Sequence, residues 1–146
     1  MSAWASLMLI TGGLFAGGAA TFAWSRVPLW RRMPVQGFSG DFEETLRRTD
    51  KVQPALLVAA IVLAAGFALS ADGLARVLAL VGAAGFIVTL TASLAFLVPL
   101  QRRIIATPPA EAGAIDKMRA RWFRGHLGRS MLAAASFVAA AVAATL

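Results

Sequence analysis

The chain has 146 residues, of which 59% are hydrophobic and only 14% are charged. A soluble domain usually carries about 25% charged residues, so this composition indicates a membrane protein. The absence of cysteine excludes disulfides, iron–sulfur clusters, thiolate zinc sites and thiol nucleophiles. The net charge of +7 would fit a nucleic-acid-binding protein, but the placement of the charges makes that explanation unnecessary.

Four apolar runs follow one another along the chain, and a helix needs about 20 such residues to cross a bilayer. A signal peptide is an alternative for the first run, which however lacks a basic start and a convincing cleavage site. We therefore expect an all-α protein, a four-helix transmembrane bundle that forms a single domain over residues 1–146. The expected spans are 3–25, 52–71, 74–100 and 127–146.

The charges between these spans are distributed unequally. Thirteen of the 14 basic residues lie in the first and third connections or at the start of the fourth span. Because basic loops stay in the cytoplasm, the sequence predicts cytoplasmic first and third loops, with both termini outside the plasma (inner) membrane. Membrane lipids are then the expected surroundings, and no nucleic-acid partner is expected.

A short segment occurs twice, as VPLWRR at Val27–Arg32 and as VPLQRR at Val98–Arg103. Each copy ends an odd-numbered span and is followed by a polar loop. The pattern favours two tandem helical hairpins related by a pseudo-twofold axis, because other membrane folds are built from parallel repeats. The alternative is that proline stops each helix and arginines anchor it at the headgroups, without any duplication.

The first loop contains an amphipathic pattern, because apolar residues recur every four positions at Phe38, Phe42 and Leu46. Asp41 and Glu44 resemble a capping box at the start of a helix. We therefore expect a short helix at the membrane surface over residues 41–50.

The third loop begins with Pro108-Pro109, which is typical of a helix start. The fourth helix is therefore expected to begin in the cytoplasm, several turns before the bilayer. The four tryptophans lie near predicted span boundaries and suit an aromatic belt. In the first span, a GxxxG pattern at Gly13 and Gly17 indicates helix packing within the bundle or, alternatively, a homo-oligomer.

A stripe of polar and aromatic residues lies where the fourth span begins. Spacings of three and four residues place its members on one helical face: Arg119, Trp122, His126 and Arg129. Ionisable residues inside a span usually face the bundle interior and pair with another group. Candidate partners at the same depth are Asp50, Gln53 and Gln101. The alternative is that His126 and Arg129 extend to the headgroups, as Arg121 and Arg124 are expected to do.

The residue inventory gives little support for a metal or a haem. One histidine and a few loop acids form no recognisable ligand pattern. The axial ligands available to a haem are His126 and the five methionines. We therefore expect no metal site and no cofactor.

Two segments carry a family pattern, VPLQRRI and RARWFRGHLGRSMLAAASFV, and the glycine-rich first span with the Val-Pro after it agrees with them. With these short motifs most of the chain resembles the anthrone oxygenase-like family of small four-span membrane proteins. The family pattern is roughly Val-Pro-Leu/Ile-Asn-x-Arg followed by Trp-x-x-x-His/Asn-x-x-Arg. Gln101 stands where asparagine is usual. The matching residues are Val98, Pro99, Arg102, Trp122, His126 and Arg129.

The resemblance implies oxidation of anthrones or similar aromatic or quinol-like molecules by O2 without an evident cofactor. On this hypothesis His126 is a catalytic base for an acidic benzylic proton, and Arg129 is catalytic because it stabilises the enolate oxygen. The candidate substrate-binding residues are Trp122, Gln101, Gln53 and Asp50. The competing hypothesis is non-enzymatic, namely an accessory subunit or a lipid- or quinone-binding module of a larger membrane complex.

Overall fold

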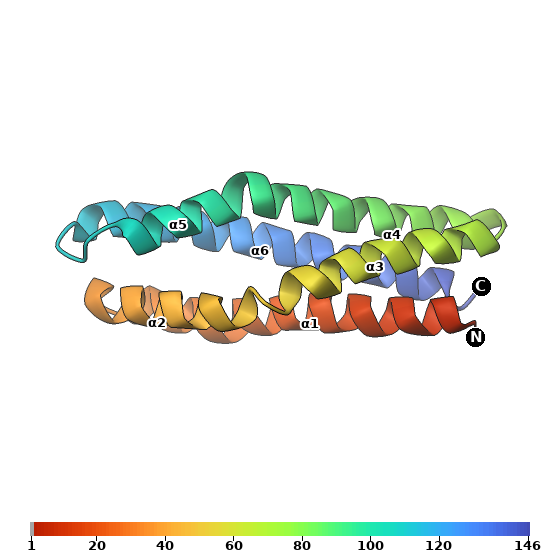
Figure 1. The fold of residues 1–146 in the computed structure, drawn as a ribbon, viewed down its shortest axis with the longest axis horizontal. Coiled ribbons are helices and arrows are strands. Elements are labelled where there is room, and N and C mark those ends of the chain that lie inside the picture. Colours follow the sequence, from red (N-terminus) through yellow and green to blue (C-terminus); the bar gives the residue numbers. More distant parts are fainter. Residues whose placement is uncertain (1) are drawn as a thin grey trace.

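The computed structural model describes residues 2–146, which form helices joined by short connections (Figure 1). This part of the chain contains no β-strand, so the prediction of an all-α protein is confirmed. Four helices are long and apolar enough to cross a membrane. Three of them are α1 (Ala3–Arg32), α3 (Gln53–Ser70) and α6 (Ala112–Ala143), and the fourth is the helix that starts as α4 (Gly73–Ala92).

The four long helices run in alternating directions and form one bundle (Figure 1). Helices α1 and α4 each pack against both α3 and α6. Figure 1 places both chain termini and the α3–α4 turn at one end of the bundle, which we call the terminal end. The opposite end holds thirteen of the 14 basic residues, and we call it the basic end.

Three shorter helical segments build the basic end. Helix α2 (Val35–Thr49) follows α1 after a sharp bend, and α4 continues through a π-helical turn, η1 (Ser93–Leu97), into α5 (Val98–Ala106). The apolar residues of α2 are buried at helical spacing, and they are Val35, Phe38, Phe42 and Leu46. This packing fixes α2 against the bundle instead of leaving it as a separate surface helix.

The helix expected over 41–50 begins six residues earlier, and the expected capping box is wrong. Pro34 cannot continue the hydrogen bonding of α1, so the chain bends there. A new helix starts with the Phe38 N–H donating to the Pro34 carbonyl at 2.9 Å. Asp41 and Glu44 consequently lie inside α2, where they bond to side chains instead of capping backbone N–H groups.

Neither proline of the repeated segment ends its helix, so the expected helix stops are wrong. Helix α1 continues past Pro28 to Arg32, and the third long helix continues past Pro99 to Ala106. A helical proline leaves the carbonyl four residues earlier without an N–H donor. For Pro99 that carbonyl belongs to Ala95, in the middle of η1. The wider π-helical turn thus accommodates the proline without breaking the helix.

The proposed duplication stays a prediction. Helices α1 and α4 run in the same direction (Figure 1), but any up-and-down bundle of four helices has this property. The connections of the two hairpins differ, because α2 follows α1 whereas only residues 107–111 separate α5 from α6. Helix α6 begins at Ala112, so the expected start at Pro108-Pro109 lies slightly too early.

The two ends of the bundle have different cores. Near the terminal end the buried residues are small, and they include Ala68, Ala79 and Ala143. At Gly82 of α4 an added Cβ would lie 2.9 Å from the Ser136 carbonyl of α6, so glycine allows these backbones to approach closely. The basic end instead contains a large aromatic cluster of Trp30, Phe38, Phe42, Trp122 and Phe123.

The tryptophans and glycines divide between the surface and the core. Trp24 is 83% exposed, whereas Trp30 and Trp122 are 0% and 3% exposed, so an aromatic belt that includes the latter two is wrong. Their rings pack into the aromatic cluster, which removes more apolar surface from contact with water than a position at the membrane boundary would. In the GxxxG pattern, Gly13 lies against the Phe137 ring, whereas Gly17 faces no other part of the described chain within 4 Å.

Candidate functional site

A cavity of about 900 Å³ opens inside the basic end of the bundle. Its apolar lining includes Phe15 of α1, Leu57 of α3 and Leu90 of α4. Its polar lining includes Arg26 of α1, Gln53 of α3 and His126 of α6. The volume lies in the range of sites that hold organic ligands of drug-like size, about 300–1,000 Å³. The mixed lining suits a molecule with one apolar and one polar edge.

Trp122 and His126 form one side of this cavity. They lie one helical turn apart on α6, and their rings stack with centroids 4.9 Å apart at an interplanar angle of 9°. Phe22 of α1 contacts both rings at centroid distances of 6.3 and 5.2 Å. This packing buries His126 to 3% exposure and holds the imidazole in a fixed orientation.

Arg129 lies one turn farther along α6 and also lines the cavity. Its Nη1 donates to the Ser93 hydroxyl at 3.4 Å, and its guanidinium lies 5.9 Å from the centre of the Phe15 ring. Ser93 in turn donates to the Thr89 carbonyl at 2.7 Å. The π-helical turn therefore supplies a hydroxyl that orients the arginine toward the interior.

Four buried side-chain atoms around this cavity have no hydrogen-bond partner within residues 2–146. They are Gln53 Oε1, Trp122 Nε1, His126 Nε2 and Arg129 Nε. Buried polar atoms are usually paired, because an unpaired one costs about 1–3 kcal/mol. All four residues line the same cavity, and such a concentration is typical of a site that a ligand completes.

Asp50 and Gln101 join the two sides of the cavity lining. The Gln101 amide nitrogen donates to the Asp50 carboxylate at 2.7 Å, which links the end of α2 to α5. Partial burial raises the pKa of the Asp50 carboxyl above its usual value, while the Gln101 amide and the Arg129 charge act in the opposite direction. Gln53 lies against Gly18 of α1, where an added Cβ would force the amide of Gln53 to move.

All six residues proposed from the sequence therefore line one cavity. Their roles in catalysis and binding stay predictions. Gln101 and Asp50 are already paired with each other, which favours a part in shaping the cavity over direct contact with a ligand.

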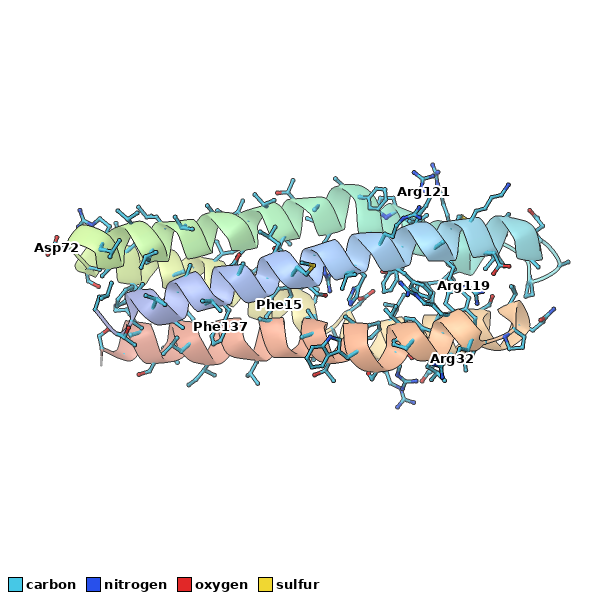
Figure 2. The ribbon with its side chains drawn as sticks, turned by 180° about the vertical axis from the view of Figure 1, so that it is seen from behind. Phe15, Arg32, Asp72, Arg119, Arg121 and Phe137 are labelled. Atoms are coloured by element: carbon cyan, nitrogen blue, oxygen red, sulfur yellow. The ribbon has the colours of Figure 1, made fainter. Side chains whose placement is uncertain are left out.

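Arg119 shares the helical stripe but has another role. It donates to the Trp30 and Met33 carbonyls at 3.0 and 2.9 Å, so it satisfies the carbonyls that the end of α1 leaves free. Figure 2 shows Arg119 between the helices, whereas Arg121 projects outward. Arg121 and Arg124 are exposed, as expected for residues that anchor the helix at headgroups.

Sequence reasoning did not identify several lining residues. Ser93 gave only the weak signal of a hydroxyl within an apolar run before a proline. Arg26 and Asp41 are ordinary loop charges in the sequence, yet they pair at 3.2 Å beside the cavity. Phe22 carries no signal, because a phenylalanine inside an apolar span is expected anywhere. The helical period of 3.6 residues shows which residues share one face of a helix. It does not show which faces surround a cavity.

The fold and this cavity define the class of protein: a small helical membrane protein with a partly polar ligand-sized cavity in its bundle. The family profile described as anthrone oxygenase matches residues 42–139. The chain therefore belongs to the anthrone oxygenase family, and the match contains α3, α4, η1, α5 and most of α6. Neither the curated proteins nor the solved structures contain a match to this chain.

Proposed function

We propose that this protein binds a flat aromatic or quinol-like molecule in the cavity at the basic end and oxidises it with O2, without a cofactor. The observation that carries the proposal is the set of four unpartnered buried polar atoms on the lining of one cavity. The family description agrees in chemistry, because an anthrone has an acidic benzylic carbon conjugated with a carbonyl. The basic end faces the cytoplasm in this proposal, since basic segments are retained there.

In the proposed reaction, His126 removes a proton from the benzylic carbon of the substrate. Its Nε2 has no other partner in the described residues, so it is available to accept the proton. The electron pair moves from the broken C–H bond into the ring system and leaves negative charge on the carbonyl oxygen. Arg129 stabilises that oxygen by a charge-assisted hydrogen bond.

The carbanion then reacts with O2. One electron passes to O2, and the two resulting radicals combine into a hydroperoxide that takes its proton from His126. Loss of the second benzylic hydrogen breaks the O–O bond and releases water, which leaves a new carbonyl on the carbon. The CH2 group thus loses four electrons, and the four electrons reduce O2 to one carbonyl oxygen and one water.

Three substitutions test this proposal in purified protein reconstituted in lipid nanodiscs. His126→Asn keeps a polar but shorter side chain and removes the base, and we expect anthrone oxidation to fall about 100-fold or more. Arg129→Lys keeps the charge but loses the planar fork of donors, and we expect about a tenfold loss. Arg124→Ala is the matched control on the exposed face of α6 and should leave the rate unchanged.

The measurements are anthraquinone absorbance and O2 uptake, with empty nanodiscs as the correction for spontaneous oxidation. Full activity of His126→Asn would rule out the proposed base. Tight binding of the aromatic molecule without any turnover would instead support the non-enzymatic ligand-binding module. For the proposed orientation, a C-terminal reporter that is active only in the cytoplasm should be silent, and a bright signal would reverse it.

A further inference from the structure

Two of the four unpartnered atoms around the cavity can only donate a hydrogen bond. An indole N–H and a guanidinium N–H can only donate, so Trp122 Nε1 and Arg129 Nε both require an acceptor. His126 Nε2 can donate or accept depending on its proton, and Gln53 Oε1 accepts. A ligand that satisfies α6 must therefore offer acceptor oxygens in this part of the cavity.

The charges of the cavity lining point in the same direction. Arg26 pairs with Asp41 at 3.2 Å and Arg48 pairs with Glu44 at 2.7 Å. Among residues 2–146, no carboxylate lies within 4.0 Å of Arg129. The remaining lining carboxyl, Asp50, is partly exposed and accepts the Gln101 amide.

Arg129 is therefore a cation without a carboxylate in contact, inside a largely apolar bundle. Its contacts are the Ser93 hydroxyl and the face of the Phe15 ring, and neither carries a negative charge. Arg129 is partly buried, and a charge removed from water is costly unless an opposite charge and hydrogen bonds compensate it. An anionic oxygen would supply both.

We propose that the cavity takes its aromatic ligand as an anion, an ionised phenol or enol whose oxygens accept hydrogen bonds from Arg129 and Trp122. The proposal rests on the proposed function for the location of the site, but it requires no turnover. Charge-assisted hydrogen bonds are about twice as strong as neutral ones. A neutral ether of the same shape could not supply the negative charge and would leave Arg129 with only the charge of Asp50, which acts on it from beyond contact distance.

The test compares a monohydroxyanthraquinone, whose hydroxyl is remote from the carbonyls, with its methyl ether. Both are already oxidised, so turnover does not interfere. Binding to the nanodisc protein is measured by quenching of tryptophan fluorescence, at pH values above and below the pKa of the free phenol. Empty nanodiscs and the methyl ether correct for partitioning into lipid.

We expect the ionised phenol to bind about tenfold more tightly than the methyl ether, which corresponds to about 1.4 kcal/mol. We also expect the ether to show no dependence on pH. Arg129→Gln keeps a planar polar group but removes the charge, and it should abolish the preference. Arg124→Gln makes the same change on the exposed face of α6 and should preserve it.

Equal affinities of the wild-type protein for phenol and ether would overturn the proposal, and this result does not depend on how any variant folds. A preference that survives Arg129→Gln would overturn it as well. Anthrone turnover without a preference for the anion would leave the proposed oxidation standing while refuting this inference. A preference for the anion without anthrone turnover would support this inference and refute the proposed oxidation.

Discussion

The basic end contains two buried tryptophans whose ring centroids lie 6.0 Å apart, and their surroundings differ in one decisive respect. Trp30 on α1 donates its indole N–H to Asp41 at 2.6 Å. Trp122 on α6 is equally buried, but its indole N–H has no partner in the described chain. Trp30 does not line the cavity, whereas Trp122 does.

This difference separates a structural region from the proposed binding region within one aromatic cluster. Around Trp30, the rings of Phe38 and Phe42 pack at 5.8 and 5.1 Å, and the indole N–H is paired. Around Trp122, packing is complete on one side, while the polar atoms on the other side lack partners. Burial alone therefore does not distinguish the two residues, and hydrogen-bond satisfaction does.

The largest expected effect comes from removing the structural tryptophan. Trp30→Ala deletes a fully buried ring and leaves the Asp41 carboxylate without its indole donor. We expect a loss of about 3–5 kcal/mol of stability, because large aromatic truncations in cores cost this much. Thermal unfolding in mild detergent measures the effect, and Trp24→Ala, which removes an 83% exposed tryptophan from the same helix, is the control. Similar melting temperatures for the two variants would contradict the structural role of Trp30.

A smaller but sharper comparison replaces each indole by a phenyl ring, which removes the N–H group together with buried ring atoms. Trp30→Phe loses the bond to Asp41 in addition to these atoms, and we expect it to lose about 1–3 kcal/mol more stability than Trp122→Phe, with little change in ligand affinity. Trp122→Phe removes a donor that has no partner in the described chain, so its loss of stability should come from the ring atoms alone. Ligand affinity should fall about two- to tenfold, the value of one hydrogen bond. If both variants lost stability equally, the distinction between the two regions would fail.

The smallest expected effect concerns Asp50, at the edge of the binding region. Because burial raises the pKa of this carboxyl above its ordinary value of 3.8, the folded state retains a proton that the unfolded state has already lost. The contribution of Asp50 to stability therefore decreases as pH rises above about 3.8. Melting temperatures of the wild-type protein and Asp50→Asn, measured across acidic and neutral pH, should diverge in favour of the variant. The effect should stay below about 1 kcal/mol, since the group is partly exposed. A melting temperature of the wild-type protein that rises relative to that of Asp50→Asn as pH increases would contradict the argument that burial raises this pKa.

The class of protein and the presence of four long apolar helices could be predicted from the amino-acid sequence alone. Long apolar runs have few other stable solutions, because every backbone polar group must be satisfied inside a membrane and helices achieve this locally. The same local periodicity placed Trp122, His126 and Arg129 on one face of α6. The family resemblance could also be read directly from VPLQRR and the residues that follow it.

Only the tertiary structure decided which polar faces meet and where space remains between them. The pairs Asp50–Gln101 and Trp30–Asp41 join residues whose separation in sequence carries no pairing signal. The continuation of the helices through Pro28 and Pro99 depends on neighbouring packing and on a π-helical turn, which local propensity did not reveal. A cavity is the volume that side chains of several helices fail to fill, so it exists only once those helices are packed.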